Sequence, residues 1–105
     1  MSAAVEHAKA LAKVLFEHYF SDHWGVTATP YGAAWYTNGW SAKADALRSR
    51  LEAEGIGVVA SGTYDDGYTT VLITDRDDSD QSCDELADLW REVFMADIRA
   101  DEVAS

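Results

Sequence analysis

The clearest secondary-structure signal in this chain is the stretch IGVVASGTYDDGYTTVLIT, residues 56–74. Its two ends, Ile56–Ser61 and Tyr68–Thr74, are rich in β-branched and aromatic residues, which favour strands. Tyr64–Gly67 between them has the composition of a hairpin loop, because a glycine at its end supplies the positive φ that such loops need. We therefore predict a β-hairpin here and build the expected fold around it.

A helix is predicted immediately before this hairpin, over Ala42–Glu54. Ser41 is a favourable N-cap, because its hydroxyl can accept from the free N–H groups of the first turn. Gly55 occupies the position where glycine commonly ends a helix. Leu47 and Leu51 lie four residues apart and are therefore the expected core contacts of this helix.

A second helix is predicted after the hairpin. It is expected to begin at the capping box Ser82–Glu85, in which the Glu85 side chain reaches back toward the cap. It frays near Asp101, so that Glu102–Ser105 form a loose tail. Its buried face consists of apolar residues at three- and four-residue steps: Leu86, Leu89, Trp90, Val93 and Phe94.

The first part of the chain supplies the remaining elements. Apolar residues at helical spacing predict a helix over Ala3–Asp22, and Val26–Thr29 and Ala33–Thr37 predict two short strands joined by a turn at Pro30–Gly32. The 105 residues form a single domain of the α+β class. Three helices pack on an antiparallel sheet of about four strands, in the order α-ββ-α-ββ-α, as a two-layer structure. This element order is similar to that of small acidic secretion chaperones, without any family motif behind the likeness.

Composition excludes several classes of protein. The net charge of −11 argues against a nucleic-acid-binding surface, because that surface must neutralise phosphates. The longest apolar runs are far shorter than a membrane span, so no membrane partner is expected. The N-terminus lacks the features of a signal peptide, and the lone Cys83 can form no internal disulfide. We therefore expect a cytoplasmic protein.

The charge is distributed unevenly along the chain. Residues 1–64 carry a net charge of −1, whereas residues 65–105 carry −10. A solvated face kept for solubility is one interpretation, although it would acidify both halves. The other is a docking surface for a basic partner, since closely spaced carboxylates can imitate the charge of a nucleic acid. The candidate residues of this acidic face are Asp75, Asp77, Asp78, Asp80, Asp84, Glu85, Asp88 and Glu92.

Aromatic residues are concentrated elsewhere, with eight of the twelve between Phe16 and Trp40. Tyr19 and one of Trp24 or Trp35 are expected in the core. A domain of this size would struggle to bury all eight, and exposed Tyr and Trp are typical interface anchors. No Lys or Arg interleaves them, so direct nucleic-acid binding by stacking is not expected. The candidate aromatic patch comprises Trp24, Tyr31, Trp35, Tyr36 and Trp40.

Motifs for catalysis or cofactor binding are weak throughout. His18 and Asp22 have helical i, i+4 spacing, but two ligands do not make a metal site. The aspartates of Asp75–Asp80 fit no EF-hand register. Cys83 has acidic neighbours that raise a thiol pKa, which opposes nucleophilic reactivity. We therefore predict no catalytic residues, no metal and no cofactor.

The leading hypothesis is a small non-enzymatic protein that modulates or inhibits a protein partner with a basic surface, by mimicking nucleic-acid charge. The acidic face would supply electrostatic steering, and the exposed aromatic residues would supply the anchor. The alternative is a dimeric chaperone or adaptor that binds a protein client through an aromatic-rich apolar surface. Salt discriminates between the two, because it screens charges and does not weaken apolar burial.

Overall fold

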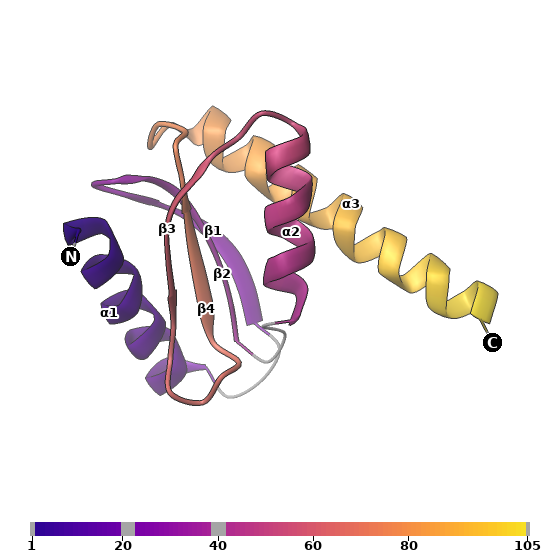
Figure 1. The fold of residues 1–105 in the computed structure, drawn as a ribbon, viewed down its shortest axis with the longest axis horizontal. Helices are drawn as coiled ribbons and strands as arrows, with labels where there is room; N and C mark the ends of the chain where they lie inside the picture. The colour runs from indigo at the N-terminus through magenta and orange to yellow at the C-terminus, as the bar shows by residue number, and fades with distance from the viewer. Residues whose placement is uncertain (1, 20–22, 39–41, 105) are drawn as a thin grey trace.

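The structure is a computed structural model that describes residues 2–19, 23–38 and 42–104. Its elements follow the predicted order α-ββ-α-ββ-α, so the α+β class is confirmed (Figure 1). The bounds of the helices and strands are α1 Ala3–His18, β1 His23–Thr29, β2 Gly32–Asn38, α2 Ala42–Ala53, β3 Val58–Thr63, β4 Thr70–Thr74 and α3 Asp80–Ala104.

The strands form one antiparallel sheet in the order β1-β2-β4-β3. Each hairpin pairs internally, and the two hairpins join where Trp35 of β2 lies opposite Leu72 of β4. The inner strands β2 and β4 are therefore central, while β1 and β3 form the edges. This topology brings the turn at the end of β1 beside the segment that follows β4.

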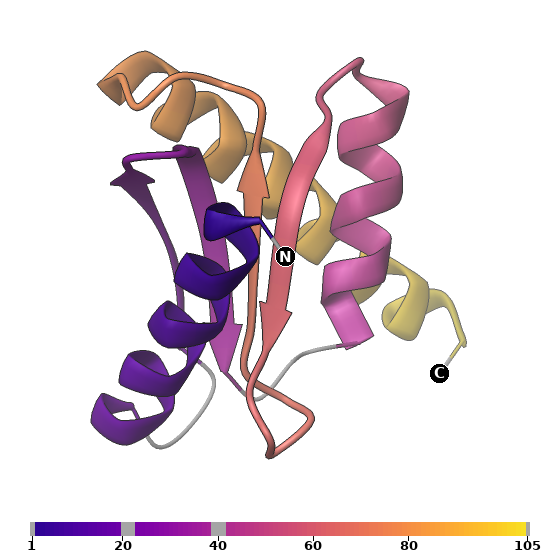
Figure 2. The same ribbon diagram turned by 60° about the vertical axis from the view of Figure 1, so that its left-hand side comes forward.

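The helices cover both faces of the sheet, so the fold has three layers (Figures 1 and 2). The prediction of two layers is wrong. Helix α1 packs on one face against Val71 and Ile73, whereas α2 and α3 pack on the other face against Leu72. A central strand enclosed on both faces needs consecutive apolar residues. The run Val71–Ile73 meets that requirement.

The larger core lies beneath α2 and α3. Trp35 of β2 and Trp90 of α3 are both fully buried there, with ring centroids 4.9 Å apart. Leu47 and Leu51 reach this cluster from α2, as their spacing predicted. The smaller core beneath α1 consists of four alanines and three larger aliphatic residues, namely Ala8, Ala12, Leu15, Ala34, Ala60, Val71 and Ile73.

The first two helices end as local sequence dictates, with one difference. Helix α1 ends at His18, four residues before the predicted end, because Tyr19 adopts an extended backbone. Helix α2 ends within a residue of the prediction. Gly55 has a φ of +79°, and the N–H groups of Gly55 and Ile56 donate to the carbonyls of Glu52 and Leu51. This is the pattern in which a glycine terminates a helix.

Helix α3 begins earlier than predicted. Ser79 is its N-cap, since the Ser79 hydroxyl accepts from the Ser82 N–H at 3.2 Å, and the helix starts at Asp80. The predicted capping box at Ser82–Glu85 is therefore wrong. Ser82 has Glu85 three residues later and fits the capping-box pattern, whereas Ser79 has Ser82 there, so the pattern favoured the wrong serine. The helix continues to Ala104, past the predicted fraying at Asp101.

Gly62 allows α1 to approach β3 closely. A Cβ atom at this position would lie 2.6 Å from the backbone nitrogen of Lys9 and 2.7 Å from the carbonyl carbon of Ala8. We expect Gly62→Ala to push α1 away from the sheet and to lower the free energy of unfolding by about 1–3 kcal/mol. Urea denaturation measures this change.

Gly25→Ala is the matched control, because the atoms nearest to its Cβ would belong to the hydroxyl end of the Tyr36 side chain and not to a backbone. An equal loss of stability in the two variants would show that the contact between α1 and β3 is not what restricts position 62.

Candidate docking surfaces

The acidic segment after β4 lies beside the β1–β2 turn. The Ala33 N–H donates to the Arg76 carbonyl at 3.1 Å. Gly32 also lies close to the end of β4, since a Cβ atom added to it would be 2.4 Å from the Thr74 carbonyl oxygen. The turn therefore carries Tyr31, which is 42% exposed, to the same end of the molecule as the start of α3. The sequence predicted both groups but not that they are neighbours.

Three of the eight predicted acidic residues are engaged in ion pairs. Glu85 lies 3.8 Å from Arg76, Asp88 lies 2.9 Å from Arg91, and Glu92 lies 2.5 Å from Arg50 of α2. All of these side chains are exposed or half-exposed, so each pair contributes little to stability. Their charge toward a partner is nevertheless reduced by the neighbouring guanidinium groups.

Asp77 has a structural role at the start of α3. Its Oδ1 accepts from the Ser79 N–H at 3.2 Å, from the Ser79 hydroxyl at 2.6 Å and from the Ser82 hydroxyl at 2.5 Å. The hydrogen bonds from Ser79 and Ser82 favour the charged form and lower the pKa of Asp77. Asp77 thus holds the N-cap region together, which the sequence interpretation as a docking residue missed.

A lowered pKa makes the contribution of Asp77 depend on pH. A carboxyl group whose pKa is depressed by folding stabilises the native state above its unfolded pKa of about 3.9, and this contribution is lost as the pH falls through the folded value. We expect Asp77→Ala to lower the urea midpoint at neutral pH, and we expect the difference from wild type to shrink in acid. A difference that stays constant at all pH values would contradict this role.

The other four acidic residues are exposed and form no ion pair with any residue that the structure describes. We call Asp75, Asp78, Asp80 and Asp84 the acidic quartet. They lie at the end of β4, in the following loop and in the first turns of α3.

Burial, followed by the charges of Asp80, Asp84 and Asp78, raises the pKa of the Cys83 thiol. The thiol is therefore poorly suited to act as a nucleophile, as predicted.

The predicted aromatic patch is not a continuous exposed surface. Trp35 is fully buried in the core and is not available for docking, so its assignment to the patch is wrong. Trp24 is half-buried, with its ring centroid 5.8 Å from that of Trp90. Tyr36 is half-buried as well, and Trp40 lies outside the described residues. Tyr31 is the member of the patch that is clearly exposed.

A row of aromatic and histidine rings occupies the open sheet face beside α1. The ring of His23 stacks on that of Tyr19 at 3.8 Å and lies 5.6 Å from that of Tyr36. Asn38 fixes this arrangement, accepting from the His23 N–H at 3.0 Å and donating to the Tyr19 carbonyl at 2.7 Å. Burial and the neighbouring Tyr19 raise the pKa of Tyr36.

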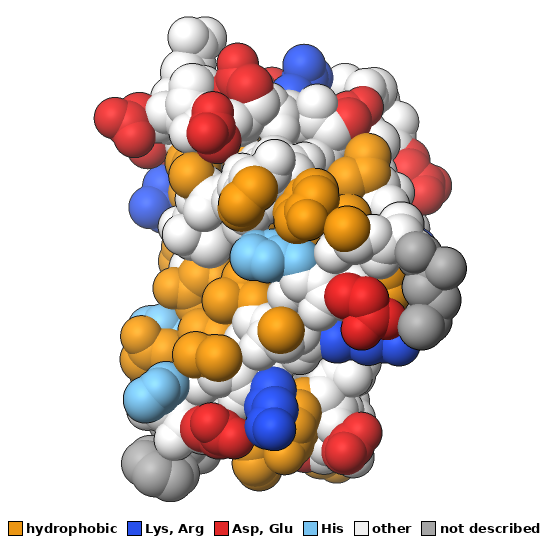
Figure 3. All heavy atoms as spheres, turned by 90° about the vertical axis from the view of Figure 1, so that its left-hand side faces the viewer, with side chains coloured by type: hydrophobic (Ala, Val, Ile, Leu, Met, Phe, Trp, Pro, Cys, Tyr) orange, Lys and Arg blue, Asp and Glu red, His pale blue; other side chains and the backbone are white. Residues whose placement is uncertain are grey.

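Figure 3 shows this side of the molecule, with histidine and hydrophobic side chains in its middle and along its left edge, and carboxylate groups at its upper and lower ends. Tyr19 is 39% exposed here, so the prediction that it belongs to the core is wrong. The early end of α1 explains this, because Tyr19 follows the last helical turn. The strand register that places His23 and Tyr36 on one face could not be fixed from the sequence.

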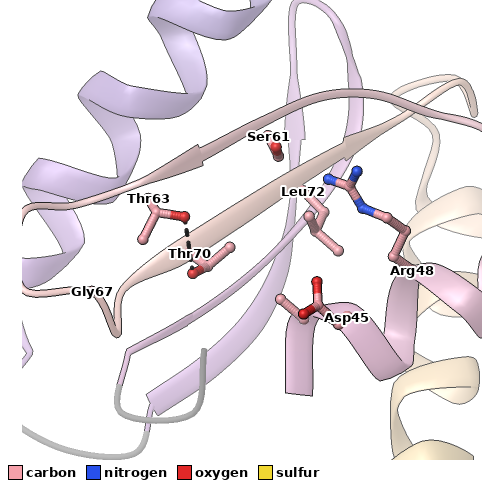
Figure 4. Close-up of a pocket in the computed structure, with 8 residues that line it drawn as sticks. Asp45, Arg48, Ser61, Thr63, Gly67, Thr70 and Leu72 are labelled. Carbon is pink, nitrogen blue, oxygen red and sulfur yellow. Dashed lines mark hydrogen bonds between the residues drawn. The ribbon is translucent and has the colours of Figure 1, made fainter. Parts of the chain in front are cut away.

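A polar cleft separates the start of α2 from β3 and β4 (Figure 4). Its volume is about 270 Å³. Asp45 and Arg48 approach it from the helix, and the hydroxyls of Thr63 and Thr70, 3.4 Å apart, line the strand side. The cleft offers hydrogen-bonding groups to a small polar molecule. No sequence pattern predicts this cleft, because α2 and the strands meet only in the fold.

Nothing in the described part of the chain forms a group of three or more His, Cys, Asp or Glu side chains able to hold a metal ion. His18 is exposed, and its predicted partner Asp22 lies outside the described residues.

No helix within the described ranges is long and apolar enough to cross a membrane. Comparison with known protein families, with curated proteins and with solved structures finds no match for this chain.

Proposed function

We propose that this protein is a non-enzymatic modulator or inhibitor that binds a macromolecule with a basic surface. The acidic quartet is the observation that carries this proposal. Four exposed carboxylates that form no ion pair with any described residue gather at one end of the molecule, whereas Glu85, Asp88 and Glu92 on α3 are each paired with an arginine. Such a cluster suits a partner that normally binds nucleic-acid phosphates, because closely spaced negative charge is what that partner recognises.

The position of Tyr31 supports the same interpretation. The β1–β2 turn places Tyr31 at the end of the molecule where the segment with the quartet begins, because the Ala33 N–H donates to the Arg76 carbonyl, and the Tyr31 ring lies 5.4 Å from the ring of His7 on α1. Electrostatic attraction sets the rate and orientation of encounter, while a desolvated aromatic ring supplies affinity at the contact. The quartet and Tyr31 together therefore have the composition of a small docking surface.

The alternative of a chaperone with an aromatic-rich surface has weaker support. The exposed aromatic rings lie in different places: Tyr31 in the β1–β2 turn, Tyr19 after α1, and Tyr68 in the β3–β4 loop. Phe16, which is also exposed, stacks on Tyr64 at 4.4 Å, and neither residue belongs to the predicted patch. These rings do not add up to one apolar client-binding face.

Capture from a lysate of the source cell, washed in parallel at low and high salt, tests the proposal. We expect a basic protein that is held at low salt and released at high salt, because salt screens exposed charges. A partner retained through both washes would contradict the acidic-surface proposal and favour apolar binding.

A further inference from the structure

The outer side of β1 carries backbone groups that have no strand beside them (Figure 2). Ala28 lies opposite Ala33, and the Ala33 N–H donates away from β1, to Arg76. In an antiparallel ladder, two opposite residues either exchange both hydrogen bonds or both turn their groups away. Ala28 therefore directs its N–H and C=O to the open edge, and so do Val26 and Trp24 at two-residue steps. Among the described residues, the one hydrogen bond to these outward groups is a 3.5 Å contact, in which the Thr27 hydroxyl donates to the Ala28 carbonyl.

β1 also lacks the features by which edge strands avoid pairing, which are charges, prolines and bulges. The opposite edge strand, β3, has a register shift between Val58 and Ala60, and α1 packs closely against it at Gly62. β1, in contrast, pairs with β2 in unbroken register over all seven residues. It belongs to a run of twenty residues, 23–42, without Asp, Glu, Lys or Arg, in a chain that is 26% charged.

We infer that a second copy of this chain pairs with β1, in an antiparallel arrangement centred on Val26. The spacing is self-complementary, because Trp24 of one subunit then lies opposite Ala28 of the partner subunit. The outward N–H and C=O groups of both strands are all satisfied, and the two sheets become one sheet of eight strands. The pairing also sets a large side chain against a small one at each end of the contact.

The distribution of charge selects a second copy as the occupant. Two copies of a chain with a net charge of −11 repel each other, so they can pair only through a surface without carboxylates. β1 provides such a surface. The acidic quartet lies near the β1–β2 turn, at one end of β1. Antiparallel pairing therefore places the quartets of the two subunits at opposite ends. A basic partner, in contrast, finds no opposite charge on this strand.

Sedimentation equilibrium tests the inference with the full chain. A contact of three residues per strand is small and hence weak, so the measurement is made up to millimolar concentration. We expect the apparent mass to double from 11.5 kDa in wild type, at low and at high salt. Ala28→Pro removes an outward N–H without breaking the β1–β2 ladder, and we expect it to stay monomeric. Ala28→Ser, which keeps the N–H, is the control and is expected to dimerise.

Amide hydrogen exchange of the wild-type chain is a second test that needs no variant. We expect the Trp24, Val26 and Ala28 amides to exchange more slowly as concentration rises, while the exchange of loop amides does not change. A monomeric wild type at millimolar concentration would overturn the inference, as would a folded Ala28→Pro variant that still dimerises. Dimerisation that persists in high salt distinguishes this contact from the acidic docking surface, so either proposal can fail without the other.

Discussion

Replacing Trp90 with alanine is expected to lower the free energy of unfolding by about 3–5 kcal/mol, the range for deleting a buried aromatic side chain. Trp90 is fully buried and contacts the rings of Trp24, Trp35 and Phe94, so it links α3 to both β1 and β2. Domains of this size have a total stability of about 5–15 kcal/mol, so the loss is a large fraction. Urea denaturation monitored by circular dichroism measures it.

Two control variants isolate the packing effect. Trp90→Phe keeps an aromatic ring, and the Trp90 indole N–H has no hydrogen-bond partner among the described residues, so this change costs less than Trp90→Ala. Tyr68→Ala removes a ring that is 61% exposed and is expected to change stability by no more than about 0.5 kcal/mol. A Trp90→Ala variant as stable as Tyr68→Ala would contradict the three-layer arrangement.

Neutralising the acidic quartet is expected to weaken binding to the captured partner by about 30-fold at physiological salt. The variant is Asp75→Asn, Asp78→Asn, Asp80→Asn and Asp84→Asn. Exposed charge pairs contribute about 0.5 kcal/mol each, so four of them account for about 2 kcal/mol, and each 1.4 kcal/mol is a factor of ten in the dissociation constant. Isothermal titration calorimetry with wild type and variant provides the comparison.

A matched variant controls for total charge. Glu17→Gln, Asp45→Asn, Glu52→Gln and Asp65→Asn also remove four negative charges, from exposed positions on α1, α2 and the β3–β4 loop. We expect this distal variant to bind almost as tightly as wild type. Asp77 is left unchanged in both variants, because its hydrogen bonds hold the start of α3 and its loss would confuse folding with binding.

Much of the fold follows from local sequence patterns. The hairpin around Gly67, which has a φ of +75°, and the helix end at Gly55 are both dictated by residues within a few positions. Local sequence does not determine which face of the sheet each helix covers. It depends on which side of the sheet each helix packs, and therefore on the pairing of β2 with β4, two strands that are more than thirty residues apart.

The candidate site was predictable in composition but not in geometry. Uneven charge directed attention to the segment after Thr74, since seven acids lie between Asp75 and Asp88. The sequence could not separate Asp77, which accepts hydrogen bonds from Ser79 and Ser82 at the start of α3, from Asp78, which forms no such bonds among the described residues, because both are aspartates in one loop. Trp35 was misassigned because a tryptophan on a central strand has the same local pattern as one on an edge strand.

The dependence of the association rate on ionic strength tests the central claim most directly. Steering by exposed charges raises the association rate at low salt, and salt screens this effect. Stopped-flow mixing with the captured partner would compare wild type, the quartet variant and the distal variant. The account predicts that association slows steeply with salt for wild type and the distal variant, and that the quartet variant loses most of this dependence. Equal salt dependence in all three proteins would contradict it.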